Sequence, residues 1–133
     1  MTFTINLDIF LQSIMFLVEV DKNEFERWYY NNTKLINDEE HDQMLKGVLD
    51  PESCMGFTVA LDSGAYVVYL REATKDMYVV HEIYHAINKI LMDAGVYHDL
   101  SDETFAYALG YVCNEYYNKV DEEKEKRKKA INN

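Results

Sequence analysis

The sequence of 133 residues is poor in cysteine and in basic residues, and each shortage excludes a class of protein. Its two cysteines, Cys54 and Cys113, have no CxxC spacing, so we expect neither a disulfide framework nor a thiolate zinc site. Only 13 Lys and Arg stand against 24 Asp and Glu, which gives a formal net charge of -11. Because this charge repels phosphate groups, we expect no nucleic-acid partner and no binding to an anionic membrane.

A long hydrophobic run is also missing. The longest apolar stretch, residues 9–20, is interrupted by Gln12, Ser13 and Glu19, and it is too short and too polar to span a bilayer. No Lys or Arg precedes the stretch and no small-residue cleavage site follows it, so we expect no secretion signal. These absences predict a small, acidic, cytoplasmic protein.

The residues that are present suit one folded domain. With 48% hydrophobic residues, the chain has the apolar content of an ordinary globular protein. Every residue from 121 to 129 is charged. We therefore predict a single domain over residues 1–120, followed by a charged helix end or tail over residues 121–133.

Strand patterns come first in the sequence and the longest helical patterns come last. Residues 3–9 alternate between apolar and polar, and residues 14–20 are apolar and rich in branched side chains, which predicts two antiparallel strands joined near Gln12-Ser13. A continuous helix over residues 7–20 is the alternative. Residues 57–61 and 65–70 flank Asp62-Ser63-Gly64 and predict a second hairpin.

Helical spacing predicts a short helix over residues 23–30 and one more turn over residues 44–49, with a polar stretch between them. Two longer helices are expected at the end of the chain, the first over residues 80–94 with its stop at Gly95 and the second starting at Ser101. The apolar stripe of the second consists of Phe105, Leu109, Val112, Tyr116 and Val120. The predicted fold is α+β, with a small antiparallel sheet of two hairpins packed on a pair of helices.

The first long helix contains an HExxH sequence, His81-Glu82-Ile83-Tyr84-His85. Residues four apart on a helix share a face with Cβ atoms about 5–6 Å apart, so both imidazoles can bind one metal ion. Glu82 points in another direction and is placed to accept a proton from an attacking water. The simpler alternative is a pair of surface histidines on an amphipathic helix.

A catalytic zinc needs a third protein ligand, and the last helix offers Glu103. Glu103 shares one helical face with Ala106, Gly110 and Cys113, and small residues on that face would let the two helices approach closely. The alternative is that Glu103 is a first-turn acid favoured by the helix dipole.

Other side chains compete for the third position. His98 is the second choice, and Asp93, Asp99 and Asp102 are further carboxylates. Tyr97 and Tyr107, like His98, are candidates for stabilising an oxyanion or donating a proton. A metzincin would need a histidine six residues after His85, where Leu91 stands, so that class is excluded.

Two runs of the sequence stand out, from His81 to Ala86 and from Asp102 to Tyr107, with Gly95 between them. This pattern resembles small zincin-like proteins of phages and prophages, which have a gluzincin-like HExxH…E arrangement. The resemblance covers most of residues 1–120 and is strongest over residues 77–112. It implies a zincin-like fold, Zn²⁺ bound by His81, His85 and Glu103, and Glu82 as general base. The larger gluzincins have an Asp four residues after the ligand Glu, where this chain has Tyr107.

The sequence and this resemblance together predict a zinc-dependent hydrolase, specifically a small metallopeptidase that acts on a peptide or protein substrate. An extended peptide would add alongside residues 65–70 if that strand lies at the sheet edge. The alternative is a catalytically silent binding or assembly protein of this fold, such as a phage accessory or virion protein. A purely structural zinc is disfavoured, because Cys113 is too far from Glu103 along the helix to complete four ligands.

Overall fold

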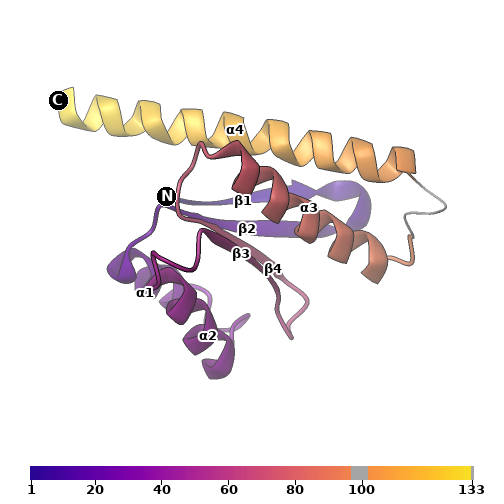
Figure 1. Ribbon diagram of the computed structural model, residues 1–133, viewed down its shortest axis with the longest axis horizontal. Coiled ribbons are helices and arrows are strands. Elements are labelled where there is room, and N and C mark those ends of the chain that lie inside the picture. Colours follow the sequence, from indigo (N-terminus) through magenta and orange to yellow (C-terminus); the bar gives the residue numbers. More distant parts are fainter. Residues whose placement is uncertain (97–101, 133) are drawn as a thin grey trace.

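The computed structural model describes residues 1–96 and 102–132, except for the side chains of Ile9 and Asp102. The elements, in chain order, are β1 (Thr2–Leu7), a short 3-10 helix η1 (Asp8–Phe10), β2 (Gln12–Val18), α1 (Lys22–Tyr30), α2 (Asp38–Val48), β3 (Gly56–Ala60), β4 (Tyr66–Leu70), α3 (Asp76–Asp93) and α4 (Asp102–Asn132). Their arrangement is that of an α+β protein (Figure 1).

The four strands form one mixed sheet in the order β1-β2-β4-β3. Both predicted hairpins are confirmed, since β1 pairs with β2 and β3 with β4, each antiparallel. The prediction of an all-antiparallel sheet is wrong, because β2 and β4 run parallel. The chain between these two strands includes α1 and α2, and this crossover brings β4 back alongside β2 in the same direction.

Helices cover both faces of the sheet (Figure 1). On β2, Ile14 and Phe16 belong to the core under α3 and α4, whereas Met15 and Leu17 belong to the core with α1 and α2. A strand buried on both faces reads as a continuous apolar run. The predicted pair of helices is therefore α3 and α4, and the sequence did not reveal that a second pair closes the other face.

The turn of the first hairpin lies earlier than predicted. It is formed by η1 and by Leu11, which adopts a left-handed conformation with φ 54° and is 90% exposed. β2 already begins at Gln12, so the turn near Gln12-Ser13 and the helix over residues 7–20 are both wrong. No glycine or asparagine marks the left-handed position, which is why the turn was misplaced.

Helix α2 begins at Asp38, six residues before the turn expected at 44–49. Asn37 and Glu40 form a capping box, in which the Asn37 side chain accepts from the Glu40 backbone and the Glu40 carboxylate accepts from the Asn37 backbone. This reciprocal cap satisfies two backbone donors at the helix start. The polar stretch between the two predicted helical segments thus contains the first turn of α2.

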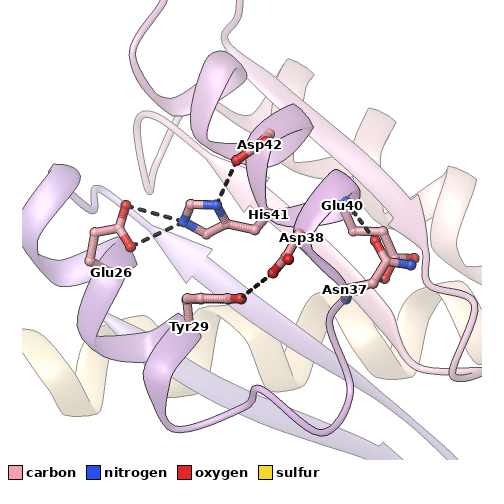
Figure 2. A network of polar contacts seen from close by, with 7 residues as sticks. All are labelled: Glu26, Tyr29, Asn37, Asp38, Glu40, His41 and Asp42. Atoms are coloured by element: carbon pink, nitrogen blue, oxygen red, sulfur yellow. Dashed lines mark hydrogen bonds and ion pairs between the residues drawn. The ribbon is translucent and has the colours of Figure 1, made fainter.

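The His41 ring on α2 lies between two carboxylates, Glu26 of α1 and Asp42 of its own helix (Figure 2). Its Nε2 atom lies 3.1 Å from both Glu26 oxygens and its Nδ1 atom 3.0 Å from Asp42 Oδ1. Burial lowers the pKa of His41, but the hydrogen bonds and charges of Asp42 and Glu26 outweigh it, so the pKa is raised above its usual 6.5. Between the same two helices, the Tyr29 hydroxyl of α1 donates to Asp38 of α2 at 3.2 Å.

The two long helices follow the sequence closely. After α3 ends, Gly95 adopts a left-handed φ of 79°, as its predicted role as a stop requires. On α4 the predicted stripe is buried, with Leu109 only partly so. The charged run forms the last turns of α4, and the predicted cap Ser101 lies outside the described residues. None of the described helices is both long and apolar enough to cross a membrane.

Candidate functional site

The HExxH sequence lies in the middle of α3, as predicted. This helix packs against β3, β4 and α4. Its buried side is formed by Val79, Ile83, Ala86, Ile87 and Ile90. Because Glu82 precedes Ile83 on the helix, it lies at the margin of that apolar side, while both histidines lie further toward solvent.

The two histidines meet at their Nε2 atoms. His81 Nε2 and His85 Nε2 are 3.1 Å apart, and the rings lie edge to face with centroids 4.6 Å apart. Two nitrogens bound to one zinc at about 2.0–2.1 Å in tetrahedral geometry lie roughly 3.3 Å apart, so this pair fits a zinc ion. The same separation also suits a hydrogen bond in which one ring donates to the other. The His81 side chain is 61% exposed, which leaves it accessible to an ion from solvent.

Glu82 is the one charged residue that is buried in the described part of the chain, where it is 8% exposed. The Thr58 hydroxyl lies 2.7 Å from Glu82 Oε2 and donates to it, and it lies 2.9 Å from the Glu82 backbone oxygen. The other carboxylate oxygen, Oε1, is 3.8 Å from His81 Nε2. Glu82 thus lies between the strand β3 and the histidine pair.

Glu103 is exposed in the first turn of α4. Within residues 1–96 and 102–132, no group of three or more His, Cys, Asp and Glu side chains is arranged to hold a metal ion. The structure therefore brings His81 and His85 together but does not add Glu103 to them. Nearby, the Phe105 ring contacts the Tyr84 ring with centroids 5.1 Å apart, which fixes the start of α4 beside the centre of α3.

Only one end of the predicted small-residue face of α4 is partly buried, since Cys113 packs against the core while the residues nearer the start of the helix are exposed. Ala106 and Gly110 are exposed, and a Cβ placed on Gly110 would meet nothing within 4 Å. The large residues Phe105, Val112 and Tyr116 face the core instead. Burying these side chains removes far more apolar area from water than burying Ala and Gly would, so the apolar stripe decides which face packs.

The other candidate site residues lie at different places in the chain. His98, Tyr97 and Asp99 lie outside the described residues, as does the side chain of Asp102. Asp93 accepts a hydrogen bond from the Tyr66 hydroxyl at the far end of α3. Burial, together with this bond to Asp93, raises the pKa of Tyr66 to about 12. Tyr107 is 75% exposed, on the groove that it shares with Leu7 and Phe10.

Thr58 was not among the predicted site residues, and the condition for peptide binding at residues 65–70, that this strand lies at the sheet edge, is not met. β4 is paired on both sides, so residues 65–70 are not at the sheet edge. The edge next to α3 is β3, which carries Gly56 and Thr58. A polar Thr within the apolar run of residues 57–61 was the available signal, because a hydroxyl on a strand that faces a helix needs a partner.

No protein-family model, curated protein or solved structure matches this chain. The candidate site consists of the two converging imidazoles, the buried Glu82 and the edge strand beside them.

Proposed function

We propose that this protein is a zinc-dependent hydrolase, and specifically a small metallopeptidase. The observation that carries the proposal is the separation of 3.1 Å between the Nε2 atoms of His81 and His85, on one face of a helix. Neutral imidazole is a preferred zinc ligand, and two of them at this spacing occupy two of the positions that a catalytic zinc needs.

The proposed ligands are His81, His85 and Glu103. Glu103 is supported by its place, because it is two residues before Phe105, whose ring contacts Tyr84 beside His85. Its side chain is exposed, and exposed side chains in general change rotamer within about picoseconds to nanoseconds, so Glu103 is free to turn toward an ion. When bound, zinc would act as a Lewis acid that polarises a peptide carbonyl and makes water more acidic.

Glu82 is the proposed general base. One of its oxygens is occupied by Thr58, and the other lies on the side of His81. A carboxylate in that position is able to take a proton from a water that attacks a carbonyl carbon beside the histidines. Because Glu82 is buried against β3, its carboxylate has few alternative positions, which favours a fixed direction for proton transfer.

The proposed substrate is an extended peptide. β3 is an edge strand next to α3, and in the described part of the chain it pairs only with β4. An added peptide strand would form backbone hydrogen bonds with β3 and pass close to Glu82. The charge of -11 favours substrates without an excess of acidic side chains.

The test uses purified protein loaded with zinc and an unfolded protein as substrate. We expect cleavage that a chelator abolishes and that added zinc restores. Glu82→Gln should retain zinc and lose cleavage, whereas the exposed control Glu72→Gln should behave as the wild type. Wild-type protein that holds zinc without cleaving would instead indicate the silent binding protein, and full activity in Glu82→Gln would exclude Glu82 as the base.

A further inference from the structure

The edge strand β3 meets Glu82 at two positions on one face. Gly56 and Thr58 are two residues apart, so both point to the side of the sheet on which α3 lies. The Thr58 hydroxyl lies 2.7 Å from Glu82 Oε2. A Cβ on Gly56 would lie 3.1 Å from Glu82 Cγ and 2.9 Å from the Tyr69 backbone oxygen. Because Gly56 has no side chain, there is room beside it for the methylene groups of Glu82.

The two oxygens of the Glu82 carboxylate have different surroundings. Oε2 accepts from Thr58, and Oε1 lies 3.8 Å from His81 Nε2. A buried carboxylate without a donor would be costly, and its terminal torsion has a broad energy profile that fixes no single orientation. The hydroxyl of Thr58 therefore selects the orientation in which the second oxygen is turned toward the histidine pair.

We propose that Thr58 is a positioning residue, which holds the Glu82 carboxylate with one oxygen directed to the histidine pair. This proposal rests on the proposed hydrolase function of the same site. A rival role is purely structural, because the Thr58 hydroxyl also lies 2.9 Å from the Glu82 backbone oxygen and ties β3 to α3. The two roles differ in what they predict for the carboxylate and for catalysis.

The test compares Thr58→Val, which keeps the shape of the side chain and removes the hydroxyl, with Thr58→Ser, which keeps the hydroxyl. Thr4→Val, an exposed position on β1, is the matched control. For zinc-loaded protein we expect Thr58→Val to lower kcat about tenfold with KM and zinc content unchanged, the loss typical of a residue that orients a site through another. Thr58→Ser should restore kcat, and Thr4→Val should equal the wild type.

A second measurement separates this proposal from the hydrolase proposal. Crystal structures of the wild type, Thr58→Val and Thr58→Ser should show the Glu82 carboxylate displaced from β3 in the valine variant alone. If the wild type has no chelator-sensitive activity, the hydrolase proposal fails while this structural comparison still tests the positioning. An unmoved carboxylate in Thr58→Val, or a kcat that serine does not restore, would overturn the role of Thr58.

Discussion

Arg71 connects the end of β4 to the end of α2, and replacing it tests how the edge strand is held. Its Nη2 atom donates to the backbone oxygens of Gly47 at 3.1 Å and Val48 at 2.9 Å, which lie in the last turn of α2. Its Nε atom donates to the Cys54 oxygen at 2.9 Å, two residues before β3 begins. One guanidinium thus fixes both the helix end and the entry to the edge strand.

The expected cost follows from these three bonds. A hydrogen bond to a charged group contributes about 1.5–3 kcal/mol when buried. Arg71 is only partly buried, so water can replace part of what is lost, and we expect Arg71→Met to lower the free energy of unfolding by about 2–3 kcal/mol in total. Methionine keeps much of the apolar stem, so packing contributes little to this change. Arg71→Lys should have an intermediate effect, because one ammonium group cannot reproduce the planar fork.

Urea denaturation followed by circular dichroism measures the effect. For a slope of about 1–3 kcal/mol per M, the midpoint of Arg71→Met should fall by about 0.7–3 M. The exposed control Arg127→Met should stay within about 0.5 kcal/mol of the wild type. A loss below about 0.5 kcal/mol for Arg71→Met would refute the view that this residue holds the edge strand in place.

Three further predictions concern single side chains. Tyr116→Phe should cost about 1–3 kcal/mol in urea denaturation, because its fully buried hydroxyl donates at 2.7 Å to a backbone oxygen that would lose its partner. Gly56→Ala should cost about 1–3 kcal/mol by overpacking in the same assay, and should displace Glu82 in a crystal structure. The raised pKa of His41 means that its charged form stabilises the fold. In denaturation at several pH values, the stability difference between wild type and His41→Gln should therefore be full below about pH 6.5 and vanish as the pH rises through the folded pKa.

The sequence predicted local structure better than the arrangement of the elements. The two hairpins and the two long helices follow from local patterns, because the turn residues 62–64 separate two apolar strand runs and the spacing within residues 80–94 reflects one buried helix face. The parallel pairing of β2 with β4 leaves no local pattern, since both strands are apolar on both faces. The early start of α2 at Asp38 was readable from the Asn37–Glu40 capping box, and that signal was overlooked.

For the candidate site too, local geometry was predictable from the sequence and contacts between elements were not. The pairing of His81 with His85 is a property of helix geometry and was predictable from their spacing alone. Contacts between elements were not, and the face of α4 was misjudged because small residues were weighed above the larger apolar stripe that contains Val112. Thr58 stands out locally as a polar residue in an apolar run, but its partner on α3 was not predictable, since a hydrogen bond from β3 to α3 depends on the sheet order.

Isothermal titration with Zn²⁺ measures whether His81 and His85 bind one zinc ion together with Glu103. We predict one ion per wild-type chain, an affinity at least about 10- to 100-fold lower in His81→Ala, His85→Ala and Glu103→Ala, and wild-type binding in the control His41→Ala. Loss in the histidine variants but not in Glu103→Ala would move the third ligand elsewhere. A wild-type chain that takes up no zinc, or histidine variants that bind it as well as the wild type, would show that this histidine pair is not a zinc site.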